Sequence, residues 1–307
     1  MNTLITGGAG FIGSHIQDKL IQLGHNVAIV DSLRSGKKEN LNPKSKFYEV
    51  DVRDLDKLKK VFEDVRPEVV FHLAAQNEVP YSMEHPMEDH DINILGMINI
   101  LECSKNHGSK IVYSNTGGAL YGEVDPKDLP ITEDFPITRP GSFYGVSKGC
   151  AELYLKLYGN LFHIPFVSLR YANVFGPRQD GNREAGIVAI FTSKMLKGET
   201  PIINGDGGHT RDYVFVEDVV EANILAMNYP HNDYFNIATS VRISNQVVFD
   251  MIRTAMKSDM KPNYGPDRPG DVRDNVLSNE KAKKLLQWEP KFSFEDGVKK
   301  TIEYYIG

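Results

Sequence analysis

The chain has 307 residues, of which 41% are hydrophobic, and its formal net charge is −6. This length allows two modest domains or one large domain with a lobe. The acidic balance and the lack of a Lys/Arg run argue against a nucleic-acid partner or an anionic membrane surface, and no uncharged apolar stretch is long enough to span a bilayer.

Strand and helix patterns alternate through the first half of the chain. Residues 3–6 predict a short buried strand, which a glycine turn connects to a helix from residue 11. Further strands are expected at 27–30, 46–50, 69–74, 110–114 and 166–170. Further helices are expected at 55–65, 92–106 and 142–161. This alternation predicts an α/β fold, a Rossmann-type doubly wound parallel sheet with helices on both faces.

After residue 173 the pattern loosens. Residues 176–186 are loop-like, 187–196 favour a helix, and 202–209 favour a turn between short strands. We expect a dinucleotide-binding domain over residues 1–175, with later returns near 210–240. Residues 176–307 are expected to form mainly a smaller α/β lobe that binds the substrate.

The cysteines and the start of the chain bear on its location. Cys103 and Cys150 are the only cysteines, and their spacing suits no metal site. Two cysteines without such spacing fit a reducing compartment. Met1 leads directly into the first predicted strand, so no signal peptide is expected. We therefore expect a cytoplasmic protein without a bound metal.

Three glycines follow the first strand at three-residue spacing: Gly7, Gly10 and Gly13. In a strand–turn–helix unit, the first permits the tight turn, the second lets a pyrophosphate approach the backbone, and the third lets the helix pack on the strand. The N-terminus of the helix then holds the phosphate charge. A glycine triplet also occurs in ordinary turns, but this context favours a dinucleotide.

An acidic residue closes the second predicted strand. Asp31 lies at roughly the 20-residue offset expected of the carboxylate that accepts the ribose hydroxyls of a dinucleotide. An acid at this position repels a 2′-phosphate, so it favours NAD over NADP. Ligands of such sheets bind at the carboxyl ends of the strands, and polar residues follow the other strands as well: Asp51, 75–77, Ser114, Thr116 and 171–173.

The predicted helix 142–161 carries a candidate catalytic pair. Tyr144 is the only one of 14 tyrosines with a lysine four residues on, Lys148. On a helix these two side chains share one face. An ammonium beside the phenol is expected to lower the tyrosine pKa from about 10 toward neutrality. Such a tyrosine can remove a proton from a substrate hydroxyl while hydride goes to NAD.

The segment SNTGGALYG, residues 114–122, follows a buried strand and supplies a further hydroxyl. Such a hydroxyl can share the substrate proton with Tyr144. We expect this group to be Thr116, with Ser114 as the alternative. The remaining possibility is that both hydroxyls only cap a turn.

Seven segments together carry a family resemblance: TGGAGFIGSH (6–15), HLAAQ (72–76), the YG segment, YGVSK (144–148), RYANVFGPRQ (170–179), TRDYVFVEDV (210–219) and RPGDV (268–272). Nearly end to end, the chain resembles the extended short-chain dehydrogenase/reductase family of NAD-dependent epimerases and dehydratases, and within it UDP-glucose 4-epimerases. The resemblance implies that hydride passes from sugar C4 to bound NAD while the tyrosine takes the O4 proton. The 4-keto sugar then turns about its diphosphate and receives the hydride on its other face.

The resemblance also implies which residues bind NAD. Phe11 and Ile12 would contact the pyrophosphate, and the adenosine ribose would be held by Asp31, Ser32, Ser35 and Gly36. The adenine would meet Asp51 and Val52. The cofactor path would be lined by Leu73, Ala74, Ala75, Gln76, Asn77 and Asn93, with Ser114, Tyr144, Lys148 and Tyr171 around the nicotinamide end. In some epimerases the position of Asn77 is a lysine.

The UDP-sugar would be bound by a second set. The diphosphate or uridine would be held by Asn173, Arg211 and Arg268, and the uridine ribose by Asp271. Ser82 would touch the sugar or a phosphate, beside Thr116 and Tyr144. Asn275 would lie where side-chain bulk decides whether an N-acetyl group fits. A homodimer is implied, paired through the helices at 92–106 and 142–161.

Related enzymes of this fold catalyse other reactions or act on other nucleotide sugars, and the sequence bears on each alternative. A 4,6-dehydratase needs an acid pair after the catalytic threonine, where this chain has Gly117 and Gly118. UDP-glucose and UDP-galactose are the expected sugars, and the N-acetylated pair and UDP-glucuronate are alternatives. A non-catalytic NAD-binding regulator is an alternative of another class, against which the combination of Tyr144, Lys148 and Thr116 speaks.

Overall fold

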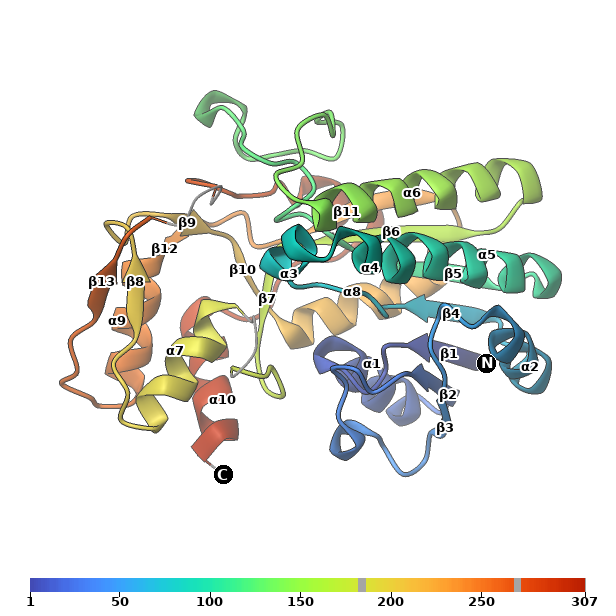
Figure 1. Cartoon of the computed structure of the whole chain (residues 1–307), viewed down its shortest axis with the longest axis horizontal. Coiled ribbons are helices and arrows are strands. Elements are labelled where there is room, and N and C mark those ends of the chain that lie inside the picture. Colours follow the sequence, from blue (N-terminus) through green and yellow to red (C-terminus); the bar gives the residue numbers. More distant parts are fainter. Residues whose placement is uncertain (182–185, 268–271, 307) are drawn as a thin grey trace.

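Seven parallel strands form the centre of the computed structural model, which describes residues 1–181, 186–267 and 272–306 (Figure 1). The strand order is β11-β6-β5-β4-β1-β2-β3. Their bounds are β1 (Asn2–Thr6), β2 (Asn26–Asp31), β3 (Lys46–Glu49), β4 (Val69–His72), β5 (Lys110–Thr116), β6 (Phe166–Tyr171) and β11 (Asp233–Ile237). From β1 the chain adds β2 and β3 on one side and then β4, β5, β6 and β11 on the other. The switch point therefore lies between β1 and β4, and doubly wound sheets bind ligands at this point. The predicted fold class is confirmed.

Helices cover both faces of this sheet (Figure 1). On one face, apolar residues of β1, β2 and β4 pack against three helices, α2 (Leu55–Val65), α5 (Gly96–His107) and α6 (Phe143–Phe162). On the other face lie α1 (Phe11–Gln22) and α8 (Val216–Asn228). Since both faces are buried, the strands are nearly continuous apolar runs.

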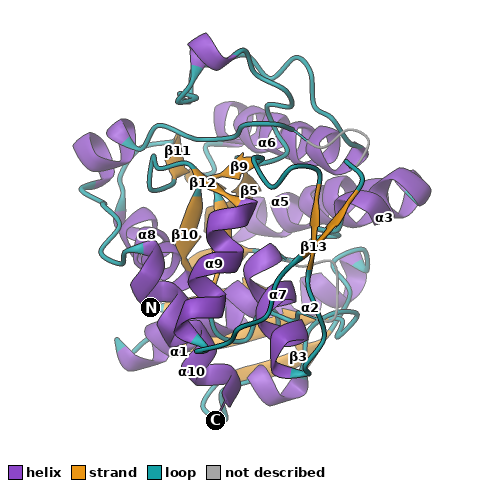
Figure 2. Cartoon of the chain, turned by 90° about the vertical axis from the view of Figure 1, so that its left-hand side faces the viewer, coloured by secondary structure: helices purple, strands orange, loops and turns teal. Residues whose placement is uncertain are grey.

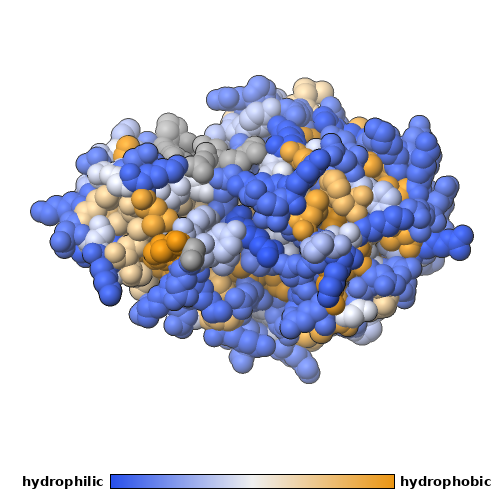
Figure 3. Space-filling view, turned by 90° about the horizontal axis from the view of Figure 1, so that it is seen from below, coloured by the Kyte–Doolittle hydropathy of each residue, from blue (hydrophilic) through white to orange (hydrophobic). Residues whose placement is uncertain are grey.

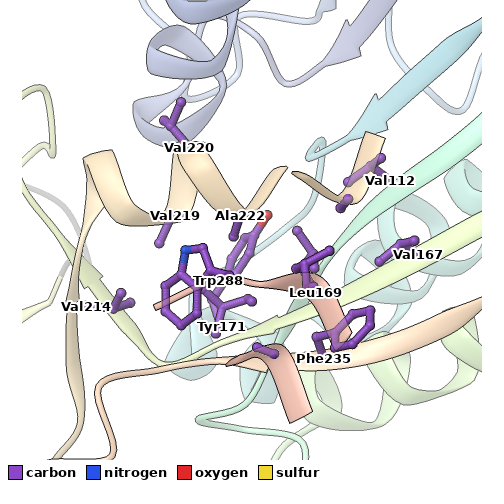
Figure 4. Packing of buried hydrophobic residues seen from close by; sticks show 14 of the residues in the cluster. Val112, Val167, Leu169, Tyr171, Val214, Val219, Val220, Ala222, Phe235 and Trp288 are labelled. Atoms are coloured by element: carbon purple, nitrogen blue, oxygen red, sulfur yellow. The ribbon is translucent and has the colours of Figure 1, made fainter. Parts of the chain in front are cut away.

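Trp288 lies at the centre of the core on the α1 and α8 side (Figure 4). It is 1% exposed, and its indole Nε1 donates a hydrogen bond to the carbonyl of Asp218 at 2.9 Å. The figure shows Tyr171 of β6 and Val219 of α8 around it. This packing ties the C-terminal part of the chain to the end of β6, next to the expected site.

A second lobe is built from short strands and three helices, which face the viewer in Figure 2. Its helices are α7 (Ile187–Leu196), α9 (Asn245–Ala255) and α10 (Phe294–Ile306). Its strands are β7 (Asn173–Phe175), β8 (Ile202–Asn204), β9 (Thr210–Arg211), β10 (Tyr213–Phe215), β12 (Ile243–Ser244) and β13 (Asn263–Gly265), in pairs β7–β10, β9–β12 and β8–β13. A cluster of aromatic and aliphatic residues forms its core.

Between β4 and α5 the chain departs from the sequence expectation. The predicted strand 69–74 ends at His72. Two short helices follow, α3 (Val79–Glu84) and α4 (Pro86–His90), each with a proline in its first turn. The predicted helix 92–106 opens with a π-helical turn, Asp91–Leu95, before α5. The helix predicted at 55–65 has the same bounds in the structure.

Seen from below, most of the surface is hydrophilic (Figure 3). Apolar groups gather toward the left end of this view, which carries α7, α9, β8 and β13 in Figure 1. Within the described ranges, none of the helices has the length and apolar character needed to cross a membrane.

Candidate active site

A cavity of about 670 Å³ opens at the carboxyl ends of the central strands. This volume lies within the range of ligand pockets, roughly 300–1,000 Å³. The residues predicted from the sequence that line it are Gly7, Gly10, Phe11, Ile12, Gly13, Asp31, Ser32, Ser35, Asp51, Val52, Leu73, Ala74, Ala75, Asn77, Ser114, Thr116, Tyr144, Lys148, Tyr171, Asn173 and Arg211. The structure thus brings most of the predicted site together.

The glycine turn after β1 has no room for side chains. Gly7 has a φ of +74°, and a Cβ there would lie 2.7 Å from the backbone nitrogen of Ala74. A Cβ at Gly13 would lie 2.3 Å from the carbonyl oxygen of Gly7. Helix α1 begins at Phe11, so the N–H groups of its first turn lack carbonyl partners within the helix. This cradle fits the diphosphate of a dinucleotide.

Asp31 is held in place at the end of β2. Its Oδ2 accepts a hydrogen bond from the backbone N–H of Ala9 at 3.0 Å, and its Oδ1 accepts one from Leu33 at 2.8 Å. Burial raises its pKa above the ordinary range, which these two bonds oppose. Gly36 does not line the cavity: a Cβ there would lie 2.8 Å from Asp31 Oδ1. Gly36 therefore leaves room for the Asp31 carboxylate, which a side chain at this position would displace.

Asp51 and Val52 lie at the end of β3, on the cavity wall. Arg53 binds the Asp51 carboxylate through Nε at 2.9 Å and Nη2 at 2.7 Å, which holds the pKa of this carboxyl below its usual range. Val52 is 5% exposed and packs on Gly96 of α5. The wall beside Asp31, at the end of the adjacent strand β3, thus combines an apolar surface with a paired charge.

Gln76 and Asn93 lie behind the cavity wall, unlike the expectation that they line the cofactor path. Both are 2% exposed. The backbone N–H of Gln76 donates to Asn93 Oδ1 at 2.9 Å, and Asn93 Nδ2 donates to the carbonyl of Gln76 at 3.0 Å. This reciprocal pair fixes the loop after β4, which presents Ala74 and Ala75 to the cavity.

Tyr144 and Lys148 lie in the first turns of α6, whose N-cap Ser142 accepts a hydrogen bond from Gly145 at 3.1 Å. The predicted lowering of the tyrosine pKa is not found: burial raises the pKa of Tyr144 to about 12, and a hydrogen bond with Thr116 opposes this rise. Lys148 Nζ instead donates to the carbonyl of Ser114 at 2.6 Å, and burial lowers its pKa to about 7. For both side chains, loss of solvation on burial is the largest cause of the pKa shift.

The geometry distinguishes the two candidate hydroxyls at the end of β5. Thr116 Oγ1 accepts a hydrogen bond from the N–H of Ala119 at 3.1 Å and also bonds to the Tyr144 phenol. Ser114 holds Lys148 through its carbonyl, and its hydroxyl bonds to Tyr171. Thr116 is thus the hydroxyl that faces Tyr144.

Ser82 and Asn275 lie outside the cavity lining. Ser82 Oγ accepts a hydrogen bond from the backbone N–H of Tyr144 at 3.2 Å and donates to the carbonyl of Val79 at 2.7 Å. It therefore anchors the start of α6. Asn275 is 1% exposed, and its Nδ2 donates to the carbonyl of Gly117 at 3.4 Å. Among the described residues its Oδ1 has no hydrogen-bond partner.

The second lobe contributes the opposite side of the cavity. The N–H of Asn173 in β7 donates to the carbonyl of Asp212 at 2.9 Å, which fixes the strand against the β9–β10 connection. Arg211 of β9 lines the cavity, and its Nη1 donates to the carbonyl of Thr210 at 2.8 Å. Arg268 and Asp271, expected to bind the nucleotide, lie outside the described residues.

The sequence analysis missed a charged rim that also lines the cavity: Arg34, Lys37, Arg178 and Asp180. These side chains form ion pairs, Arg34 with Glu88 at 3.1 Å, Lys37 with Asp180 at 3.2 Å and Arg178 with Asp18 at 2.8 Å. Arg34 and Lys37 follow Asp31 closely in the sequence, and this proximity is the signal that could have found them. Throughout the described part of the chain, no group of three His, Cys, Asp or Glu side chains could hold a metal ion.

Comparisons with known proteins find relatives that match nearly the whole chain. A putative UDP-glucose 4-epimerase from Methanocaldococcus jannaschii is 46% identical and covers 98% of this chain and 97% of its own. The UDP-glucose 4-epimerase of Thermotoga maritima, solved with UDP-glucose, is 48% identical with a TM-score of 0.97 and covers 100% of this chain and 99% of its own. That of Thermus thermophilus, solved with NAD, is 40% identical with a TM-score of 0.94 and covers 100% and 99%.

The family match covers most of the chain. Residues 3–238 match the NAD dependent epimerase/dehydratase family. This match takes in the glycine cradle, Asp31 and the Thr116–Tyr144–Lys148 group. The expectations of an NAD cofactor and of an epimerase-type isomerase are confirmed. The chain belongs to the NAD-dependent epimerase/dehydratase family.

Proposed function

We propose that this chain is a UDP-sugar 4-epimerase that interconverts UDP-glucose and UDP-galactose. The observation that carries the proposal is the convergence of Thr116, Tyr144 and Lys148 in the same cavity as the dinucleotide cradle, with Arg211 and Asn173 on its other side. The residues proposed to bind the cofactor and those proposed to bind the sugar thus line the same cavity.

The proposed mechanism assigns the proton steps to α6 and β5. When bound, NAD would supply the group that accepts the hydride from sugar C4 and later returns it. Tyr144 takes the O4 proton and gives it back, and Thr116 shares this hydrogen bond. The Lys148 ammonium, held by the carbonyl of Ser114 at 2.6 Å, favours the phenolate. No net oxidation results, and C4 is inverted because the keto sugar presents its other face.

The two glycines after Thr116 support epimerisation rather than dehydration. A Cβ at Gly117 would lie 2.2 Å from Leu277 Cδ1 and 3.2 Å from the carbonyl oxygen of Tyr171, so an acid there would require Leu277 to move. Gly118 lines the cavity, and a Cβ added there would lie 3.6 Å from Asn173 Oδ1. As a glycine, it has no side chain that could donate a proton. A 4,6-dehydratase, which must exchange protons at this place, is therefore not supported.

The proposed sugar preference follows the relatives that are named UDP-glucose 4-epimerases. Asn275, expected to decide whether an N-acetyl group fits, lies behind Gly117 rather than in the cavity lining. The N-acetylated sugars and UDP-glucuronate stay as alternatives. We also propose that residues 1–175 bind NAD and that residues 176–307 mainly bind the nucleotide sugar. The return of α8 and β11 to the central sheet, within the expected range 210–240, supports this assignment.

We also infer a homodimer that pairs through α6. Solvent-facing apolar residues recur at helical spacing along this helix, and the most exposed are Leu153 at 68%, Leu157 at 49% and Leu161 at 61%. The opposite face of the helix, with Ala151 and Leu155, is buried on the sheet. A second copy would cover this outer stripe, as C2 dimers do with self-complementary surfaces. The two free cysteines support the proposed cytoplasmic location.

Product analysis tests the function. The purified protein, without added cofactor, is incubated separately with UDP-galactose, UDP-N-acetylgalactosamine and UDP-glucuronate. The account predicts that UDP-galactose yields UDP-glucose, because bound NAD is recycled within the site. If only another pair is converted, the sugar assignment is wrong. If none is converted even with NAD supplied, the epimerase proposal fails.

A further inference from the structure

A buried carboxylate lies beside the catalytic helix. Asp89, near the end of α4, is 1% exposed. Its Oδ1 accepts hydrogen bonds from Asn93 Nδ2 at 3.1 Å and from Gln76 Nε2 at 3.3 Å, and Ser147 is a further side-chain partner. All of these partners are neutral. A buried charge is costly unless an opposite charge or strong hydrogen bonds compensate it.

Burial raises the pKa of the Asp89 carboxyl, and the charge of Lys148 opposes this rise. Ser147, a side-chain partner of Asp89, directly precedes Lys148 in α6. The relation is mutual, since Asp89 is the first acid that favours the charged form of Lys148. The second such acid, Glu152, is already bound by Arg170 through Nε at 3.1 Å and Nη2 at 2.5 Å. Asp89 is therefore the less compensated of the two carboxylates.

The other groups around Lys148 carry no full charge. From β5, the Tyr113 ring centroid lies 4.3 Å from the ammonium, and the Ser114 carbonyl accepts its hydrogen bond. From β4, His72 is neutral because burial lowers its pKa to about 3. From α6, Tyr144 is a phenol whose pKa burial raises to about 12. These surroundings leave the Lys148 charge dependent on the two acids.

Hydrogen bonds fix Asp89 relative to the catalytic pair. Asn93 Nδ2 also donates to Ser147 Oγ at 3.0 Å, and Ser147 Oγ donates to the carbonyl of Tyr144 at 3.1 Å. The cluster thus joins α4, the π-helical turn and the first turns of α6. It also explains why Gln76 and Asn93 lie behind the wall, where they orient Asp89 rather than contact a ligand.

We propose that Asp89 is a positioning residue that compensates the charge of Lys148 and so sets the protonation of the Tyr144–Lys148 pair. The assay of this proposal rests on the proposed epimerase function. A negative charge opposes proton loss from any neighbour, so Asp89 raises the pKa values of both Tyr144 and Lys148. A neutral residue at 89 therefore lowers both, and the activity profile moves to more acidic pH.

The test compares pH profiles of kcat for the enzyme as purified. Asp89→Asn keeps the size of the side chain and one acceptor oxygen, and we expect its profile to shift by roughly one unit toward acid. Asp89→Glu keeps the charge and is expected to restore the original profile. Ser147→Ala is the matched control within the cluster: it removes a hydrogen bond without changing charge, so kcat can fall while the profile stays in place.

A second readout does not depend on turnover. Tyrosinate absorbance is titrated in each variant, and the titration of Tyr144→Phe is subtracted to isolate Tyr144. The neutral variant should ionise Tyr144 at lower pH. If Asp89→Asn does not fold, Asp89→Ser takes its place. A folded neutral variant with unshifted profile and titration overturns the proposal. If the unmodified enzyme shows no epimerisation, the proposed function fails, and the titration alone still decides the role of Asp89.

Discussion

At the scale of single residues, burial shifts the pKa values of the catalytic pair, whose two members line the same cavity. Burial raises the pKa of Tyr144 to about 12 and lowers that of Lys148 to about 7. The spacing of the two residues alone predicts a lowered tyrosine pKa. Desolvation depends on the surrounding fold, which local spacing does not contain. The positive charge of a bound nicotinamide would favour the Tyr144 phenolate.

Replacing Thr116 tests which hydroxyl shares the substrate proton. Thr116→Val removes the hydroxyl with little change in shape, and kcat is expected to fall on the order of 10²-fold while KM changes little. Ser114→Ala is the control, since the Ser114 contact to Lys148 uses the backbone carbonyl, which alanine keeps. Steady-state kinetics measure both. A larger loss for Ser114→Ala than for Thr116→Val would reverse the assignment.

The same scale shows which site residues a sequence can predict. Gly7, Gly13 and Asp31 are predictable because their roles follow from one local strand–turn–helix unit. Gln76 and Asn77 are neighbours, yet only Asn77 lines the cavity. After a strand end, one residue of register decides which side chain faces the ligand. Arg178 reaches the cavity from a loop distant in sequence, so no local pattern indicates it.

At the scale of elements, long periodic segments were predictable and short ones were not. The bounds of α2 and the position of α6 follow from apolar periodicity over three or more turns. The helices α3 and α4 have six and five residues, which is too short for periodicity to show. Each begins with a proline in its first turn, a position that proline favours in helices.

The outer face of α6 carries a prediction at this scale. We expect the double variant Leu153→Glu/Leu157→Glu to be monomeric, because two charges four residues apart on one face oppose burial against a second copy. Sedimentation velocity measures the mass. The matched control is Leu285→Glu, a comparably exposed leucine at 43% on another surface, which should leave the mass unchanged. A double variant that keeps the dimer mass would rule out α6 as the interface.

At the scale of the whole molecule, two parts of the chain enclose one cavity. The central sheet supplies the dinucleotide cradle at its switch point, and the second lobe supplies Arg211 and Asn173. Ion pairs such as Lys37–Asp180 at 3.2 Å connect the β2–β3 loop with the loop before α7 across this cavity. The general architecture was predictable from alternation of elements. The contacts between the lobes depend on packing of segments far apart in sequence.

Retention of deuterium at sugar C4 tests whether the hydride that leaves C4 returns to it within the same site. UDP-galactose that carries deuterium at C4 is converted in ordinary water, and the product is examined by mass spectrometry and NMR. The account predicts UDP-glucose that retains deuterium at C4, because the hydride leaves and returns within one closed site. Loss of the label to solvent would contradict it, since C4 would then be inverted through proton exchange and Tyr144 would have a different role.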